Sequence, residues 1–260
     1  MKQKLSKNIF LLCSFFFILS VSRGQNVKDF SLFFPMIKFS YAFQLPGSDL
    51  AKRFGYNSNV GLNFSIKTKK NWIYGASGSF FFGDQIKENG MLDSLKTSTS
   101  SGPHTGFIIN QNGNPEVVRL FERGFTVSLH VGKMFPVFGK NKNSGLIIYA
   151  GPTYIRHHIK IYDVDRQAAQ IVKQYVAGYD RLTAGFGANE FIGYVYLGNK
   201  RILNFFGGFD LTQTFTKSQR SYDYDLMRVD TQKRKDFLYG IRIGWILPLY
   251  KKTPQQFYYH

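Results

Sequence analysis

The stretch Asn59-Val60-Gly61-Leu62-Asn63-Phe64-Ser65-Ile66-Lys67-Thr68 decides the fold class. Every second residue from Val60 to Ile66 is apolar, and the residues between them are small or polar. A period of two places the apolar side chains on one face of a β-strand and the others on the opposite face. A segment of about ten such residues is long enough to cross a membrane as one strand of a barrel.

Seven further segments show the same alternation, and together with the first they predict eight strands. They run over residues 34–44, 72–82, 124–135, 145–161, 182–197, 203–212 and 237–249. The segment that starts at 145 is apolar on both faces at first, so its facing stays open. In the segment that starts at 182 the apolar phase changes near Asn189. This change predicts a β-bulge, because an extra residue shifts the facing by one.

The connectors between these segments alternate in length. Short ones cover 69–71, 137–143 and 198–200, and longer ones cover 45–56, 84–123, 162–180 and 217–235. Bacterial outer-membrane barrels have short periplasmic turns and long external loops, and an even number of strands. A secreted β-sandwich could have as many strands, but it has no reason to keep this order. The predicted fold class is therefore all-β, an antiparallel up-and-down transmembrane β-barrel of eight strands.

The N-terminal residues have the three parts of a secretory signal peptide. A basic start precedes an apolar core from Ile9 to Val21, and Gly24 precedes the expected cleavage site. Cys13, the only cysteine, lies in this leader, so the mature chain would hold no disulfide and no thiolate metal site. We predict a cleaved signal peptide (1–24), a barrel in the outer membrane of a Gram-negative envelope (25–250) and a periplasmic C-terminal tail (251–260).

The chain is strongly basic, with a formal net charge of +18 at pH 7. Cleavage would remove Lys2, Lys4, Lys7 and Arg23 and no acidic residue, which leaves +14. Such a charge favours partners that carry phosphate, either nucleic acid or lipid headgroups. Export argues against nucleic acid. We therefore expect outer-membrane lipid and lipopolysaccharide as partners.

The last predicted strand carries Gly240, Ile243 and Trp245, a glycine followed by spaced apolar and aromatic residues. With the strand pattern, these residues make the chain resemble the small eight-stranded outer-membrane barrels, namely the OmpA-like and OmpX-like proteins and the PorT-like barrels of Bacteroidota. The resemblance covers nearly all of the mature chain and implies architecture rather than function. The chain departs from it at the end, since residues 251–260 continue beyond the last strand.

Charges sorted by side of the membrane give a basic periplasmic edge without an acidic residue. Its members lie at the short turns, the strand ends and the tail, and they are Lys67, Lys69, Lys70, Lys133, Lys140, Lys142, Lys200, Arg201, Lys251 and Lys252. Two interpretations stay open. The cations can anchor the barrel to lipid phosphates, or they can form a docking face for an acidic periplasmic or outer-membrane protein. In the second case Phe257, Tyr258 and Tyr259 of the tail would add a further contact.

Five ionisable residues are expected inside the barrel: Lys38, His130, Glu190, Asp210 and Arg242. Asp210 and Arg242 lie near the middle of neighbouring strands, so we predict an ion pair between them across the strands. An eight-stranded barrel has room for little beyond its own side chains. A pore is therefore not expected.

The sequence indicates no catalytic, cofactor-binding or metal site. His104, His157, His158 and Ser221 lie in or near the external loops, but no spacing ties them into a nucleophile with its base. We predict a non-enzymatic structural or interaction protein, such as an accessory subunit of an outer-membrane assembly or secretion complex. The alternative is a lipid-modifying enzyme at the extracellular rim. A binder of small ligands in the barrel mouth is a third option without a residue set of its own.

Overall fold

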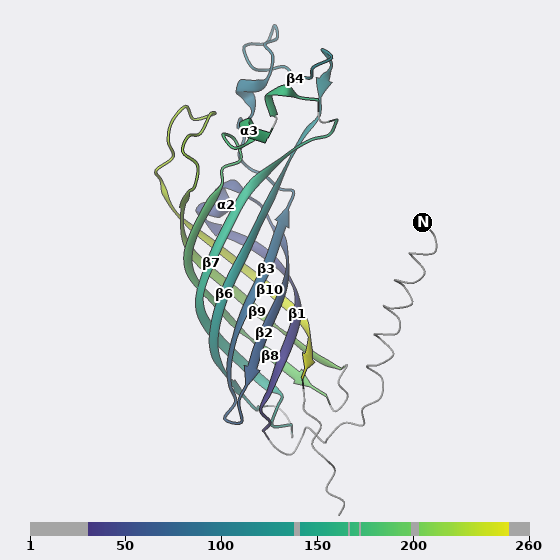
Figure 1. Ribbon diagram of the computed structural model, residues 1–260, viewed down its shortest axis with the longest axis vertical. Coiled ribbons are helices and arrows are strands. Elements are labelled where there is room, and N and C mark those ends of the chain that lie inside the picture. Colours follow the sequence, from purple (N-terminus) through teal and green to yellow (C-terminus); the bar gives the residue numbers. More distant parts are fainter. Residues whose placement is uncertain (1–30, 138–140, 166, 172, 199–202, 250–260) are drawn as a thin grey trace, which may run out of the picture.

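The computed structural model describes residues 31–137, 141–165, 167–171, 173–198 and 203–249. They form the predicted closed antiparallel barrel, in the strand order β1-β10-β9-β8-β7-β6-β3-β2 (Figure 1). Its eight strands are β1 (Phe34–Ser48), β2 (Asn57–Lys67), β3 (Trp72–Gly83), β6 (Val118–Phe135), β7 (Gly145–Asp163), β8 (Thr183–Leu197), β9 (Asn204–Ser218) and β10 (Lys233–Pro248). No helix in this part of the chain has the length and apolar character needed to span a membrane.

Each strand pairs with its neighbour along the chain, and β1 closes the barrel against β10, with Phe39 opposite Trp245. The predicted order of connectors is confirmed: the short turns lie at one end, here called the short-turn end, and the long connectors lie at the other, the long-loop end (Figure 1). Three of the four long connectors are shorter than predicted, and the one between β7 and β8 keeps its predicted length. The strands continue past the predicted boundaries, so that β6 begins at Val118 and β10 at Lys233.

The outward face of the barrel is a wall of exposed apolar side chains. A soluble protein would bury such residues, because each one leaves a large apolar area in contact with water. The wall includes Phe39, Tyr41, Phe43, Val60, Leu62, Phe64, Phe80, Val127, Leu129, Val131, Ile148, Ile192, Phe209, Ile241 and Ile243. The facing predicted from alternation is confirmed for β1, β2, β3, β6, β9 and β10.

The prediction for β8 is wrong in two respects. The pairing of β8 with β7 and β9 runs without an inserted residue, so there is no bulge near Asn189. Phe191, Val195 and Leu197 point inward and are buried, whereas Glu190 points outward and is exposed rather than lying in the lumen. The lumen is apolar near the short turns. In this part of β8 the inward and the outward residues are therefore both apolar, and the sequence pattern looks like a change of facing.

Two hydrophobic cores fill the barrel. The lower core lies towards the short-turn end and consists of Phe34, Met36, Ile73, Met134, Ile147, Tyr149, Phe191, Val195, Leu197, Phe206 and Ile246. It explains why residues 146–149 are apolar on both faces, since Ile147 and Tyr149 belong to the core while Ile148 belongs to the wall. The upper core joins the barrel to the long connectors, and its buried members are Leu50, Phe54, Phe81, Met91, Leu92, Ile108, Ile155, Ile159, Ala168, Ile171, Tyr179 and Leu238.

The long connectors fold over the long-loop end as a cap, which we define as the described residues of 49–56, 84–117, 164–182 and 219–232. The cap contains α2 (Asp49–Arg53), the 3-10 turns η1 (Asp93–Leu95) and η2 (Ala169–Ile171), α3 (Lys173–Val176) and the hairpin of β4 (Ile108–Ile109) with β5 (Pro115–Glu116). Figure 1 shows α2 at the mouth and β4 farther out. The cap is thus packed onto the barrel by the upper core.

Candidate functional site

Polar side chains fill the middle of the lumen. Asp210 on β9 and Arg242 on β10 form an ion pair, with 2.7 Å between Oδ2 and Nη2, and both are largely buried. Gln44 and Asn189 also donate hydrogen bonds to this carboxylate, at 3.4 and 3.2 Å. These contacts hold four consecutive strands, β1, β10, β9 and β8, to one buried charge.

Two more of the expected lumen residues lie below this pair. The Lys38 ammonium lies 5.5 Å from the centre of the Tyr149 ring and 5.7 Å from that of Phe206, and Lys38 is 2% exposed. His130 contacts Asn63 and Ser65 through Nε2, at 3.3 and 3.2 Å. A Cβ at Gly75 would lie 2.4 Å from the Phe64 carbonyl oxygen and 2.7 Å from Nε2 of His130, so glycine is needed there for both the strand and the ring.

The short-turn end is closed from inside. Lys67 was predicted at the basic edge, but its side chain turns inward and is 0% exposed. Its ammonium donates hydrogen bonds to Ser31, to the Leu32 carbonyl and to Asn143, at 3.1, 3.2 and 2.9 Å. Lys67 follows Asn63 and Ser65 in the inward phase of β2, and for this reason it cannot serve as an outer anchor or docking residue.

The other members of the basic edge divide into two groups. Lys69, Lys70, Lys133 and Lys142 are exposed, and the Lys133 ammonium lies 5.6 Å from the centre of the Trp72 ring. The remaining members and the aromatic tail residues lie outside the described residues, as does the signal peptide; they are Lys140, Lys200, Arg201, Lys251, Lys252, Phe257, Tyr258 and Tyr259.

The upper lumen holds a buried histidine that could suggest catalysis. His157 Nε2 lies 3.0 Å from Oδ2 of Asp236, and both side chains are 0% exposed. The nearby hydroxyl, that of Thr216, donates to the same Asp236 oxygen at 2.5 Å, and Nδ1 of His157 has no partner among the described residues. The acid therefore lies between the hydroxyl and the histidine. A nucleophile needs its base beside it, and this order does not provide one.

Charged pairs line the mouth beneath the cap. Arg53 of α2 contacts Glu88 at 2.7 Å, Arg181 contacts Asp225 at 2.5 Å, and Arg220 forms two bonds to Asp180. Arg234 contacts Asp230 at 2.6 Å. We call these four ion pairs the mouth cluster. Each pair except the last joins segments far apart in the sequence, so the cluster fixes the connectors relative to one another. Among the described residues no group of three or more His, Cys, Asp or Glu could hold a metal ion.

A cavity of about 320 Å³ opens within this cluster, between α2 and residues 226–234. Its lining mixes acids and bases, namely Asp49, Lys52, Arg53, Glu88, Arg181, Arg228, Asp230 and Arg234. Deeper in the cluster, burial raises the pKa of Asp223 and that of Asp225, although Arg181 opposes the rise in both. The Asp180 carboxylate, through its hydrogen bonds, raises the pKa of Arg220. Such a lining suits a polar ligand with several hydrogen-bonding groups.

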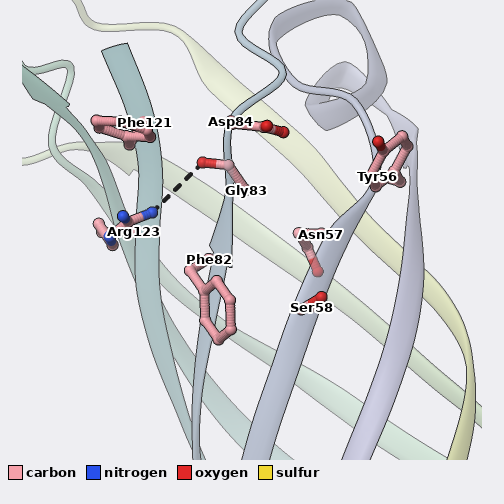
Figure 2. A pocket seen from close by; sticks show the side chains of 8 residues that line it. All are labelled: Tyr56, Asn57, Ser58, Phe82, Gly83, Asp84, Phe121 and Arg123. Carbon is pink, nitrogen blue, oxygen red and sulfur yellow. Dashed lines mark hydrogen bonds between the residues drawn. The ribbon is translucent and has the colours of Figure 1, made fainter. Parts of the chain in front are cut away.

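A second hollow lies on the outer wall just below the cap, on β2, β3 and β6 (Figure 2). Arg123 donates to the Gly83 carbonyl at 3.4 Å, and its guanidinium lies 4.9 and 5.9 Å from the centres of the Phe121 and Phe82 rings. Figure 2 shows Tyr56 across the hollow from this group. The hollow has a volume of about 340 Å³ and combines a cation with aromatic faces.

Comparison with known proteins gives a likeness of fold. The sequence matches no protein-family model and no curated protein sequence. The barrel is similar to the solved structures of OprG from Pseudomonas aeruginosa (12% identity, 85% of this chain and 99% of that one, TM-score 0.38) and of a major outer membrane protein from Thermus thermophilus (11% identity, 83% and 99%, TM-score 0.40). It is also similar to Ail of Yersinia pestis (10% identity, 82% and 97%, TM-score 0.35).

Sequence reasoning missed the mouth cluster. A signal was present, because Arg220, Asp223, Asp225, Arg228 and Asp230 place both charge signs at short spacing in one connector. Alternating charges in a loop are usually solvated, however. Their burial here follows from the folding of the cap over the mouth, and that packing joins connectors that no local pattern links.

Proposed function

We propose that this protein is a non-enzymatic barrel of the outer membrane that acts through its surfaces, as a structural or interaction protein and as an accessory subunit of an outer-membrane assembly or secretion complex. The observation that carries the proposal is the combination of an apolar outer wall with a lumen filled by its own side chains. Lipid is the environment in which such a wall is stable. A filled lumen leaves the outer surfaces for contact with other molecules.

The two ends of the barrel offer different surfaces. With the short turns in the periplasm, the cap faces outward and carries the mixed charges of the mouth cavity. The short-turn end carries exposed lysines, among them Lys69, Lys70 and Lys142. We propose that these cations, together with the edge residues beyond the described part and the aromatic tail, orient an acidic partner, since rim charges mainly set orientation and association rate.

The non-enzymatic assignment rests on the upper lumen. His157 is bonded to Asp236 and is buried beneath the cap, and the Thr216 hydroxyl contacts the acid instead of the histidine. If a lipid-modifying activity resided at the rim instead, lipid A from a deletion strain would differ in mass from that of the parent strain. We expect no difference.

Membrane fractionation and co-purification test the proposal. The protein should enter the outer-membrane fraction, migrate differently in gels before and after heating, and co-purify with partners in mild detergent. Deletion of 254–260, or Lys140→Glu with Lys142→Glu, should release those partners while the heat-dependent migration persists. Absence from the outer membrane would overturn the location, and purification alone under all conditions would overturn the subunit role.

A further inference from the structure

Glu190 is a carboxylate that projects from the outer wall. It lies on β8 between Ala188 and Ile192, which are exposed on the same face, and its own side chain is exposed. No hydrogen bond or ion pair joins it to another residue in the described part of the chain. An ionisable group of this kind within a membrane is expensive to keep, and where one occurs it generally has a function.

The position of Glu190 on its strand places it deep in the apolar band. Phe186 lies four residues towards the long-loop end and Tyr194 four residues towards the short-turn end, and both are exposed on the same face. A strand rises about 3.3 Å per residue and tilts by about 40° in such a barrel, so four residues correspond to about 10 Å along the membrane normal. The lipid-facing band is about 25 Å tall. Glu190 is therefore near its middle.

Small or polar side chains surround Glu190 on its β7 side and towards the long-loop end, whereas Leu211 on β9 lies directly opposite it. Ala150 on β7 lies opposite Glu190, Pro152 lies opposite Ala188, and all three neighbours are exposed or half-buried on the outer face. Gln213 on β9 lies on the other side of Ala188 and is exposed as well. We call Ala150, Pro152, Ala188, Glu190 and Gln213 the β8 patch. Small side chains let another backbone approach closely.

The sheet itself is interrupted beside the patch. The pairing of β6 with β7 passes from Ser128–Thr153 to Val131–Ala150 without pairing the residues between them, although the register does not change. Proline has no N–H to give to the ladder, and it is found at the edges of sheets or at bulges. A lipid-facing wall tolerates such a gap poorly, because lipid offers no replacement hydrogen bonds.

We propose that the β8 patch is a lateral contact with a different membrane-embedded protein, one that presents a lysine or arginine at the level of Glu190. This inference rests on the proposed membrane location. Charge complementarity selects the partner: among the described residues, the outward cations of the strands lie towards the two ends, as Lys133, Arg156 and Lys217 do. A second copy of this chain would place two carboxylates together, whereas a basic side chain would neutralise one.

Site-specific photo-cross-linking in the native outer membrane tests the proposal. A photoreactive residue is placed at Ala188, and a matched control is placed at Leu62, an equally lipid-facing position on β2. We expect one defined adduct from position 188 and none from position 62, with a yield at least tenfold lower in Glu190→Ala. The cross-linked peptide should contain a lysine or arginine, and exchange of that residue for glutamate should restore the adduct in Glu190→Lys.

Three results would overturn the lateral contact: equal labelling at both positions, an adduct unaffected by Glu190→Ala, or an adduct of twice the mass of this chain. Fractionation and heat-dependent migration of the same variants separate this failure from failure of the proposed function. Variants that remain in the outer membrane and change migration on heating would leave the membrane barrel in place even without the contact.

Discussion

At the scale of single residues, the charges inside and outside the barrel have opposite consequences. Asp210 neutralises Arg242 in a lumen packed with side chains, so removal of the acid leaves a buried guanidinium without its partner. We expect Asp210→Ala to lower the free energy of unfolding by about 3–5 kcal/mol. Urea unfolding in lipid vesicles measures this difference.

The matched control for this prediction replaces both partners. Asp210→Leu combined with Arg242→Met removes the pair and leaves no unpaired charge, so its cost should be clearly smaller than that of Asp210→Ala. Equal losses of stability in the single and double variants would show that the unpaired guanidinium is not the cause of the loss. The sequence predicted this pair correctly in position, because alternation placed both residues inward on neighbouring strands.

Removal of the Glu190 carboxylate should have the opposite effect on stability, because this carboxylate faces lipid and has no buried partner among the described residues. In the isolated protein, Glu190→Leu should raise the free energy of unfolding in vesicles by about 1–2 kcal/mol, because a charged group on the lipid face is destabilising near the middle of the band. Leu62→Glu on β2 is the reciprocal control and should lower stability by a similar amount. A loss of stability in Glu190→Leu would indicate that the carboxylate does not face lipid.

At the scale of elements, β8 shows where sequence periodicity fails. Alternation sets facing correctly only where one face is polar, as in β2, where Asn63 and Ser65 alternate with Leu62 and Phe64. In β8 the lower core makes the inward residues apolar too. The pattern of one strand cannot reveal this, because the core is assembled from side chains of several strands.

The facing of β8 can be tested with two phenylalanines of the same strand. Phe191 stacks on Tyr149 with ring centres 5.0 Å apart and is 2% exposed, whereas Phe186 is 72% exposed. We expect Phe191→Ala to cost about 3–5 kcal/mol of stability, and Phe186→Ala to cost much less, because only the first leaves a cavity. Small and similar costs for both variants in vesicle unfolding would support the bulged strand, which places both rings on the lipid face.

The connector 219–232 should respond to pH. Burial raises the pKa of Asp223 and of Asp225, so their folded-state pKa exceeds the unfolded value of about 3.9. The stability they contribute is fully present below the unfolded pKa and is lost as pH rises through the folded pKa. For Asp230 burial acts to raise the pKa, but the hydrogen bonds from Arg234 and the Gln232 backbone and the charges of Arg234 and Arg181 together outweigh it, so the net pKa is lowered. Asp230 therefore loses its contribution only in stronger acid.

We therefore expect this connector to resist proteolysis better at pH 5 than at pH 8. The cleavage rate after the exposed Arg228 is measured at each pH and divided by the rate in Asp223→Asn with Asp225→Asn, which cancels the pH dependence of the protease. The ratio should rise with pH. A constant ratio, or one that falls, would contradict the assigned direction of these pKa shifts.

At the scale of the whole molecule, the barrel is a closed cylinder with a cap on one end and lysines on the other. Alternation and connector lengths predicted the strand number, the order and the sidedness of the connectors. They could not predict the cap, because its core joins residues such as Leu50, Met91 and Ile171 from three different connectors. Nor could they predict the mouth cluster, whose ion pairs depend on that packing.

The central claim is that side chains fill the lumen, so that the protein acts through its surfaces and not as a channel. Conductance of planar lipid bilayers tests it most directly, with refolded protein whose insertion is verified by heat-dependent migration in gels. The lower core, Lys67 and the Asp210–Arg242 pair should together block the lumen, so we predict no conductance steps above those of bilayers without protein. Reproducible steps from the inserted, folded protein would contradict the account.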